Sequence, residues 1–384
     1  MVQLIHLLLA ENWSISYAST ASSSEHSIDL LEMGIAAHHI QLNSSTFDSF
    51  ITQLNPNIVI FDRFMVEEQF GWRVAECCPE ALRILDTEDL HCLRLSRQDA
   101  FKEGIAFSKD QLFNRHAFRE IASIYRCDLS LIISKYEIQL LQDYFGISNQ
   151  LLHYIPFLLE PLEKPFEPFE NRTGFVTIGN FLHPPNWAAI QALSTSIWPE
   201  IKRLVPEATL DVYGAYATEK VWQLHHPKKG FYIKGRAEDA LESIKNYKVL
   251  LSPLPYGAGI KGKLIDAMQA GTPSITTPIG AEGIPHTNWP GAVVPYDSTK
   301  EFVKEAIAYY TDDKLWKGGQ AEGMEIINTH FQKKHFATTL IKRLKEHQAN
   351  QNELRKSNFI GAMLQHHGLQ STKYLAKWIE EKNR

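Results

Sequence analysis

The sequence predicts an α/β fold with two domains, each built around a parallel β-sheet. Short apolar runs rich in β-branched residues alternate with segments of helical periodicity along most of the 384 residues, which is typical of parallel sheets covered by helices. This length is sufficient for two domains of ordinary size. The alternation stops over residues 159–172, LEPLEKPFEPFENR, where three prolines and little periodicity indicate a linker between the domains.

Six strands are expected before this linker. The apolar runs that predict them are 13–19, 37–43, 57–62, 82–86, 128–134 and 153–156. The start of the chain differs, because Leu4, Ile5, Leu8 and Leu9 fit one face of a helix and β-branched residues are scarce there. We therefore expect the first domain, residues 1–160, to begin with a helix.

Strands and helices alternate again after the linker. The expected strands are 174–180, 208–214, 231–235, 248–254 and 274–277, and the expected helices are 186–204, 238–246 and 262–270. They define a second domain at residues 172–325. Residues 326–384 have a helical pattern, and their apolar stripe of Tyr374, Leu375, Trp378 and Ile379 is expected to pack on the first domain.

Charge and cysteine content argue against several classes of function. A formal net charge of −5 disfavours duplex nucleic acid or an anionic membrane as the main partner, since both favour a basic surface. The four cysteines form no CxxC pair, and no histidine pair has metal-ligand spacing, so no metal site is predicted. No apolar run approaches the roughly 20 residues of a spanning helix. We expect a cytoplasmic protein for which peripheral membrane contact stays open.

One stretch has the composition of an anion-binding loop. Residues 254–284, LPYGAGIKGKLIDAMQAGTPSITTPIGAEGI, follow a predicted strand and lead into a helix that begins near Gly262 and ends at Gly271. Glycines allow close backbone approach, lysines add charge, and the helix start offers unpaired amides, which together suit a diphosphate. The residues concerned are Gly257, Gly259, Gly262, Lys261 and Lys263. In an open α/β sheet, a loop that follows a strand is placed for ligand binding.

Lys263 and Asp266 are three residues apart and share a helix face. Two interpretations stay open: a phosphate-binding lysine beside a hydroxyl-binding acid, or an exposed ion pair. The segment GAGIKGKL does not fit the Walker pattern GxxxxGK[ST], and the predicted strand at 274–277 that follows its glycines does not end in the acid of a dinucleotide-binding fingerprint. ATP hydrolysis and dinucleotide oxidoreduction are therefore disfavoured.

Three segments carry a family resemblance: GNFLHPPNWAAIQALSTSIWPEIKRLVPEATLDVYG, IKGRAED and LLSPLPYGAGIKGKLIDAMQAGTPSITTPIGAEGI. They resemble the nucleotide-sugar-binding domain of group 1, family 4 type, retaining glycosyltransferases of GT-B fold, in the branch with a GAGIKGK motif. The resemblance covers roughly residues 172–290, and is weaker for the strands of the first domain and for the terminal helices. It implies two Rossmann-like domains facing a cleft, with the C-terminal helices crossing back to the first domain.

The resemblance implies donor-binding roles in the second domain. Asp266 matches the acid that binds the ribose hydroxyls, whereas the partner acid, which is separated from it by seven residues in the family, is replaced by Ala258. The amides of Gly259, Ile260 and Lys261 would face the donor phosphates, and Lys263 would neutralise charge as the nucleoside diphosphate leaves. The other implied donor-binding positions are Gly179, His183, Asn186, Gly235, Arg236, Gly257 and Gly262.

The first domain supplies the remaining catalytic candidates. Polar residues follow the strand at 82–86, where the family has a histidine that touches the donor sugar; His91 is the nearest match, although offset, and Glu88 and Asp89 lie nearer the usual position. Carboxylates and a histidine suit sugar hydroxyls and an acceptor nucleophile. Capping and surface ion pairs are the alternative interpretation.

The family's first strand and its glycine-rich loop have no match at the start of this sequence. That strand is central in a doubly wound sheet, so its absence would leave a gap and unpaired backbone groups. Three explanations stay open: upstream residues are not included in the sequence, which we favour, MVQLIHLLLA is forced into the strand, or the domain is compromised.

We therefore expect a glycosyltransferase that moves a sugar from a nucleotide-diphosphate donor to a saccharide, lipid or protein acceptor, with retention and without a metal or cofactor. Attack from the face of the leaving group, with the departing phosphate taking the acceptor's proton, needs no protein base. Two alternatives stay open. One is a non-catalytic nucleotide-sugar-binding or scaffold protein, which Ala258 favours, and the other is a GT-B-like epimerase or phosphorylase.

Overall fold

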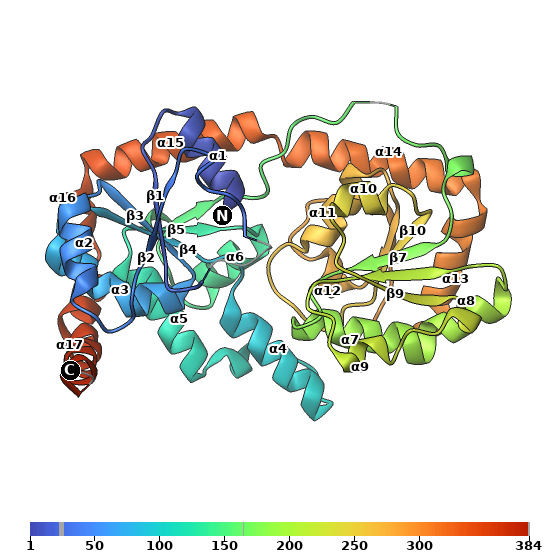
Figure 1. Ribbon diagram of the computed structural model, residues 1–384, viewed down its shortest axis with the longest axis horizontal. Helices are drawn as coiled ribbons and strands as arrows, with labels where there is room; N and C mark the ends of the chain where they lie inside the picture. The colour runs from blue at the N-terminus through green and yellow to red at the C-terminus, as the bar shows by residue number, and fades with distance from the viewer. Residues whose placement is uncertain (23–26, 164, 383–384) are drawn as a thin grey trace. The chain divides into compact units, whose positions relative to one another are not determined.

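The computed structural model describes residues 1–22, 27–163 and 165–382, without the side chains of 367–370. The chain divides into two compact units (Figure 1). Unit 1 comprises residues 1–88, 113–158 and 335–384, and unit 2 comprises 89–112 and 159–334. This division differs from the boundaries predicted from the sequence in residues 89–112, 159–160 and 326–334, which belong to unit 2. Both units contain parallel sheets, so the predicted α/β class is confirmed.

Unit 2 contains a six-stranded sheet in the order β12-β11-β10-β7-β8-β9. Its strands are β7 (Phe175–Ile178), β8 (Leu210–Tyr213), β9 (Phe231–Gly235), β10 (Val249–Ser252), β11 (Ser274–Thr276) and β12 (Gly291–Val293). All neighbouring strands pair in parallel. Chain order therefore runs outward from β7 to β9 and then resumes on the other side of β7 with β10, which is the doubly wound pattern with a switch point between β7 and β10.

Helices cover both faces of this sheet (Figure 1). One face carries the connected helices α7 (Pro184–Ala192) and α8 (Trp198–Leu204) together with α13 (Thr299–Thr311), and Phe302, Ile190 and Trp198 share one apolar core with β7 and β10. The other face carries α10 (Ala240–Ile244), α11 (Gly262–Gln269) and α14 (Asp313–His330). The unit also contains α4 (His91–Glu103), α9 (Glu219–Trp222) and α12 (Pro278–Ala281).

Unit 1 contains two separate parallel sheets. The larger has the order β3-β4-β5-β6, and the smaller pairs β1 with β2. Their strands are β1 (Ser16–Ser19), β2 (Ala36–His39), β3 (Ile58–Asp62), β4 (Leu82–Asp86), β5 (Leu129–Ile132) and β6 (Leu152–Tyr154). Within the described part of the chain no pairing joins β1 to β3, and the expected gap therefore lies between these two strands. Ile58, Val59 and Ile60 are correspondingly half-buried, whereas β4 and β5 are buried throughout.

The first residues form the helix α1 (Val2–Ala10), as predicted, and the alternative in which they become a strand is wrong. Leu4, Leu7 and Leu8 of α1 pack in one core with β4, β5 and α15 (Lys333–Ala349). Burying three leucines contributes roughly 1.5–3 kcal/mol each, which explains why this apolar segment lies on the sheet face. The other helices of the unit are α2 (Thr46–Leu54), α3 (Phe64–Cys77), α5 (Arg115–Arg126), α6 (Lys135–Asp143), α16 (Gln351–Ser357) and α17 (Phe359–Lys382).

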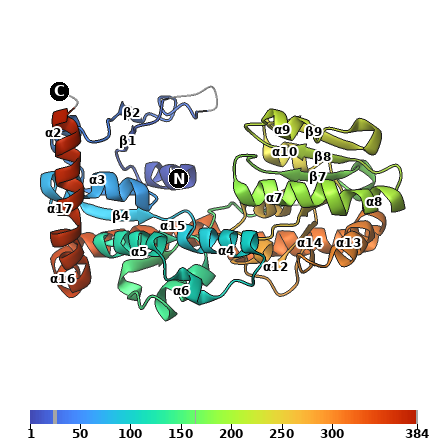
Figure 2. The same ribbon diagram turned by 90° about the horizontal axis from the view of Figure 1, so that it is seen from below.

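The last helix packs with a face that the sequence did not indicate. Helix α17 runs along α3 and α5 (Figure 2), and its residue Ala376 is only 3% exposed. Tyr374, Leu375 and Trp378 are 63%, 56% and 60% exposed and Ile379 is half-buried, so the prediction that this stripe packs on the first domain is wrong for three of its four residues, although α17 itself packs on unit 1. Polar bonds hold the helix on its inner side, where Gln365 donates to the carbonyl of Arg126 at 2.8 Å and Lys373 pairs with Glu76.

Candidate functional site

The topology of unit 2 places a ligand site at the carboxyl ends of β7 and β10. Neighbouring strands at a switch point send their connections to opposite faces of the sheet, which leaves a crevice between the two loops. The loop after β7 holds Gly179 and leads into α7, and the loop after β10 holds Gly257 and leads into α11. Both loops contain residues that the sequence predicted to bind the donor.

The loop after β7 brings three of the predicted residues into contact. The Nζ atom of Lys263 donates to Oδ1 of Asn186 at 2.8 Å, and Nδ2 of Asn186 donates to the carbonyl of Asn180 at 3.1 Å. A Cβ atom added to Gly179 would lie 2.6 Å from Nδ2 of Asn186 and 2.9 Å from Nζ of Lys263. Gly179 is therefore the residue that leaves room for this amide and ammonium.

Lys263 lies in a desolvated position. Burial lowers the pKa of its ammonium from 10.5 to about 8. Its bond to Asn186 is to a neutral amide oxygen, which compensates for burial less well than a carboxylate would. A lysine held in this way binds an anion more favourably than an exposed one, because little water has to be displaced.

Asp266 lies on the same helix and is also perturbed. Burial, followed by the charge of Asp239, raises the pKa of its carboxyl group from 3.8 to about 6. Among the described residues no ion pair joins Asp266 to Lys263, whose ammonium donates to Asn186 instead, and both residues are half-buried. The interpretation of an exposed helix ion pair is therefore wrong.

The loop after β10 is held by cations at its carbonyl groups. Gly259 has φ +62°, which favours glycine, and its carbonyl accepts from Nζ of Lys261 at 2.9 Å. Lys261 thus bonds within its own loop. The helix α11 begins at Gly262 and ends before Gly271, whose φ is +65°, as the sequence predicted. Ala258 and Ile260 are each only 9% exposed.

A second polar cluster surrounds His183. Asp89 accepts from Nε of Arg94 at 2.7 Å and lies 3.3 Å from Nε2 of His91. Burial, and then the positive charge of Arg94, lowers the pKa of His183, to which Lys263 also contributes. The residues Asp89, Arg94 and Lys263 therefore all lie within electrostatic range of this imidazole.

Glu88 makes its ion pair within unit 1. It belongs to unit 1, has φ +61°, and its exposed carboxylate pairs with the amino terminus of Met1 at 3.4 Å. Of the three catalytic candidates that follow β4, the structure therefore gathers Asp89 and His91.

Gly235 is the last residue of β9, at the edge of the sheet, and Arg236 follows it. Gly235 has φ +72°, its carbonyl accepts from the amide of Gly214 at 2.7 Å, and a Cβ atom there would meet the ring of Trp222 at 3.9 Å. Both residues thus lie at the carboxyl end of the sheet, as a base-binding segment requires, with an aromatic ring beside them.

Sequence reasoning gave no role to several residues of this region. Arg97 of α4 donates to the carbonyl of Gly257 at 2.8 Å and forms a bidentate ion pair with Glu282 at 2.7 and 2.8 Å. Glu282 stands in the GAEGI segment that follows β11. The position of Glu282 could have indicated a role in this region, because it follows β11, the strand next to β10, and loops after neighbouring parallel strands lie at the same edge of the sheet.

In residues 1–22, 27–163 and 165–382, no group of three or more histidine, cysteine or acidic side chains is arranged to hold a metal ion. No helix of the described chain is long and apolar enough to span a bilayer.

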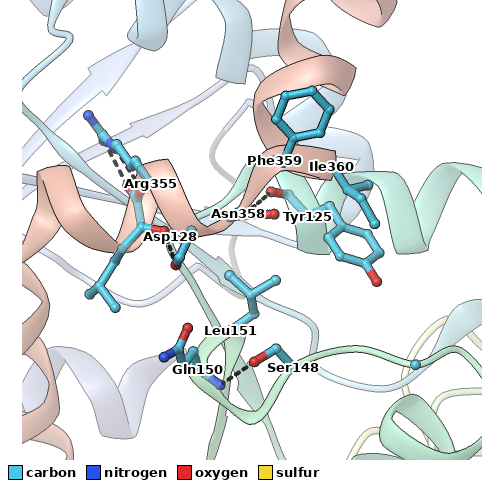
Figure 3. A pocket seen from close by; sticks show the side chains of 12 residues that line it. Tyr125, Asp128, Ser148, Gln150, Leu151, Arg355, Asn358, Phe359 and Ile360 are labelled. Atoms are coloured by element: carbon cyan, nitrogen blue, oxygen red, sulfur yellow. Dashed lines mark hydrogen bonds and ion pairs between the residues drawn. The ribbon is translucent and has the colours of Figure 1, made fainter.

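Unit 1 contains a separate pocket of about 270 Å³ (Figure 3). It is lined by residues of α16, α17 and the turn before β6, and includes none of the residues predicted from the sequence. The guanidinium of Arg355 at this pocket is bonded to Asp128 at 2.7 and 2.8 Å and to the carbonyl of Ala81 at 2.8 Å. Since these bonds fix the terminal helices to unit 1, the polar groups here have a structural explanation.

Residues 172–312 match the protein-family model described as Glycosyl transferases group 1. The match covers less than half of the chain and includes both loops at the switch point. No curated protein sequence matches the chain.

Solved structures with low sequence identity share the fold. Sucrose-phosphate synthase from Thermosynechococcus elongatus is 14% identical with a TM-score of 0.68, covering 90% of this chain and 91% of that protein. HepE from Anabaena in complex with UDP and glucose is 13% identical with a TM-score of 0.66, covering 89% and 95%. These likenesses show that the chain has the GT-B fold.

The chain also resembles larger proteins. A variant of TarM from S. aureus in complex with UDP is 12% identical with a TM-score of 0.62, over 77% of this chain. The chain spans 58% of the length of that protein and 59% of the pneumococcal O-GlcNAc transferase GtfA.

Proposed function

We propose that this protein is a glycosyltransferase that transfers a sugar from a nucleoside-diphosphate donor to an acceptor. The observation that carries the proposal is the contact of Gly179, Asn186 and Lys263 at the switch point, within the segment that matches the group 1 model. A doubly wound domain binds its ligand at this position, and a desolvated lysine beside a glycine opening suits a diphosphate.

Donor binding uses three kinds of group in this proposal. Lys263 neutralises the diphosphate, the amides of Gly259, Ile260 and Lys261 donate to its oxygens, and Asp266 accepts from the ribose hydroxyls. Gly235 and Arg236 contact the base, and Gly179, Gly257 and Gly262 leave space for the backbone to approach. UDP is the first nucleotide to test, because it is bound in the structures of TarM and HepE.

The transfer step follows from charge development at the leaving group. The bond between the anomeric carbon and the phosphate oxygen breaks while the acceptor oxygen bonds to the same carbon from the same face, with retention. The departing phosphate takes the acceptor's proton, so atoms and charges balance without a metal ion or cofactor. Lys263 and the loop amides stabilise the negative charge that develops, which is usually the largest catalytic effect.

His91 and Asp89 are proposed to contact the sugar rather than the phosphates. Asp89 orients the imidazole of His91 through the 3.3 Å contact, and His183 adds a second imidazole whose lowered pKa keeps it neutral at pH 7. A neutral imidazole donates to a sugar hydroxyl or to the acceptor without repelling the cationic Arg94. The exposed Glu88 is left as an acceptor-side candidate.

The alternative of a non-catalytic nucleotide-sugar-binding or scaffold protein is favoured by two specific observations. Ala258 occupies the position of an acid in the related motif, and in the described residues β1 and β3 of unit 1 do not pair. A binding protein needs the donor site of unit 2 but not a complete acceptor-binding unit.

A panel of radiolabelled nucleotide sugars separates these possibilities. Hydrolysis or transfer of one donor supports an enzyme, binding without turnover supports the scaffold protein, and absence of binding to every nucleotide contradicts both. Lys263→Met is the matched variant, because it preserves the side-chain length and removes the charge. Configuration at the anomeric carbon, read by nuclear magnetic resonance of the product, tests retention, and chelator treatment tests metal independence.

The finer statements on location and acceptor also belong to this proposal. A cytoplasmic location is supported by four free cysteines, which are typical of a reducing compartment. Peripheral membrane contact is proposed only if the acceptor is a lipid. Cosedimentation of the protein with anionic vesicles that contain this lipid tests the membrane contact.

A further inference from the structure

Helix α4 contacts the donor loop with one face. Arg97, Gln98 and Phe101 follow helical spacing, and each touches residues of the two loops beyond β10 and β11. Arg97 bonds to Gly257 and Glu282, Gln98 bonds to the hydroxyl of Tyr256, and the ring of Phe101 lies 5.3 Å from that of Tyr256. All of these residues belong to unit 2, although the chain on both sides of residues 89–112 belongs to unit 1.

The bond from Arg97 fixes the orientation of one peptide group. The carbonyl of Gly257 and the amide of Ala258 belong to the same planar trans peptide, so they point in opposite directions. Because the carbonyl accepts from Arg97 at 2.8 Å, the amide of Ala258 is directed away from the guanidinium. Lys261 orients the peptide between Gly259 and Ile260 in the same way. Its ammonium donates to the carbonyl of Gly259, so the amide of Ile260 is directed away from the ammonium.

Glu282 makes this arrangement stable. Both carboxylate oxygens accept from Arg97, at 2.7 and 2.8 Å, and the two side chains are 6% and 15% exposed. A bidentate pair fixes the plane of the guanidinium, and the negative charge compensates for burying it. The ring of Phe107 lies 5.3 Å from the guanidinium and limits its movement further.

We propose that Arg97 and Glu282 are positioning residues that fix the donor-loop backbone at Gly257, next to the amides of residues 259–261, before the diphosphate binds. The inference rests on the proposed function, and Arg97 acts through Gly257 rather than by contacting the nucleotide. Preorganised donors stabilise an anion more than mobile ones, because they need no rearrangement when it binds. The pair also joins the loops after β10 and β11.

The test compares a nucleoside diphosphate with its nucleoside, for example UDP with uridine. We measure both affinities by calorimetry for the full chain and for Arg97→Met and Glu282→Gln. We expect the affinity for UDP to fall about tenfold or more, the effect of losing a charge-assisted bond, while the affinity for uridine changes less than twofold. Arg203→Met, which removes the exposed pair of Arg203 with Glu200, is the matched control and should change neither.

A double variant separates positioning from stabilisation. Arg97→Glu with Glu282→Arg can restore the ion pair but cannot restore the bond to the Gly257 carbonyl. We expect it to recover thermal stability relative to Arg97→Met without recovering affinity for UDP, and Arg97→Lys to recover affinity in part.

Two outcomes overturn the inference: unchanged affinity for UDP in Arg97→Met, or an equal loss for UDP and uridine. Failure of the proposed function gives a different result, because the unmodified chain would then bind none of UDP, GDP and ADP. If instead the wild-type protein binds UDP and Arg97→Met binds it equally well, only the positioning role is refuted.

Discussion

The affinity for a nucleoside diphosphate should fall steeply between pH 7 and pH 9. Lys263 has a pKa of about 8 in the ligand-free protein because it is buried beside a neutral amide. Its protonated fraction therefore falls from about nine tenths at pH 7 to about one tenth at pH 9. If a bound diphosphate raises the pKa to its ordinary value of 10.5, the lysine stays protonated in the complex, and linkage predicts that affinity decreases about tenfold over this range.

The direction of this effect follows from which state holds the proton. The complex binds the proton more tightly than the free protein, so affinity is complete below the free pKa and is lost as pH rises from about 8 towards the pKa of the complex. The tenfold change corresponds to about 1.4 kcal/mol. The charge of the ligand contributes little above pH 7, because the last phosphate ionisation lies near pH 6.

Calorimetry with UDP at four pH values from 7 to 9 measures the effect. Lys263→Arg is the control, since its guanidinium stays charged to above pH 12, and its affinity should be flat over the range. Lys263→Met should bind weakly at every pH, also with a flat profile. A wild-type affinity that does not change with pH, or a decrease that persists in Lys263→Met, would refute the assignment of this lysine to the phosphates.

Three further predictions concern other residues. Asp266 has a raised pKa of about 6, so nucleotide affinity should also decrease below pH 6 as its carboxyl group is protonated. Asp239→Asn should move the midpoint of this decrease to lower pH, because the charge of Asp239 contributes to the raised pKa. A midpoint that Asp239→Asn leaves unchanged in a pH titration would contradict this contribution. Gly179→Ala should weaken nucleotide binding about tenfold or more, because its Cβ lies 2.6 Å from Nδ2 of Asn186 and neighbours must move; equal affinity with an unchanged circular dichroism spectrum would show that the opening is not used. Trp378→Ser should change the free energy of unfolding by less than about 0.5 kcal/mol because the side chain is 60% exposed, and a loss of about 3 kcal/mol or more in urea denaturation would show that the ring is packed.

The fold of unit 2 was predictable because its central strands β7, β10 and β11 are buried at nearly every position. Such strands are short continuous apolar runs bounded by glycine and proline, and β7 to β11 all lie within the expected segments. The short strand β12, Gly291–Val293, was missed, since three residues carry no periodicity. In unit 1, the gap between β1 and β3 was expected, because a sheet needs its central strand to pair both neighbours.

The packing of α17 was not predictable from its apolar stripe. A hydrophobic periodicity shows that one helix face is distinctive, but it does not show which face is packed. Small residues decide it here, because Ala376 and Gly361 allow α17 to approach its neighbours closely while the large side chains of Tyr374 and Trp378 stay outside. Small residues give little hydropathy signal.

The candidate site was predictable only within one loop. The spacing of Lys263 and Asp266 follows from helix geometry, but the contact of Lys263 with Asn186 joins residues 77 positions apart. The bond of Arg97 to Glu282 joins residues 185 positions apart. It also depends on helix α4, which belongs to unit 2 although the segments before and after residues 89–112 belong to unit 1. Such contacts depend on tertiary packing, which periodicity does not specify.

The two shifted groups on α11 give a final argument that the site is built for a ligand. Lys263 and Asp266 are opposite charges at a spacing that allows a direct ion pair, which would stabilise the helix by a few tenths of a kcal/mol. Instead, burial moves the pKa of the lysine down to about 8 and that of the acid up to about 6, so each charge is held at an energetic cost. A molecule that carries a diphosphate and a diol at matching positions would relieve both costs in one binding event. Because perturbed pKa values of this kind concentrate at functional sites, the two shifts support the proposed assignment of both residues to donor binding.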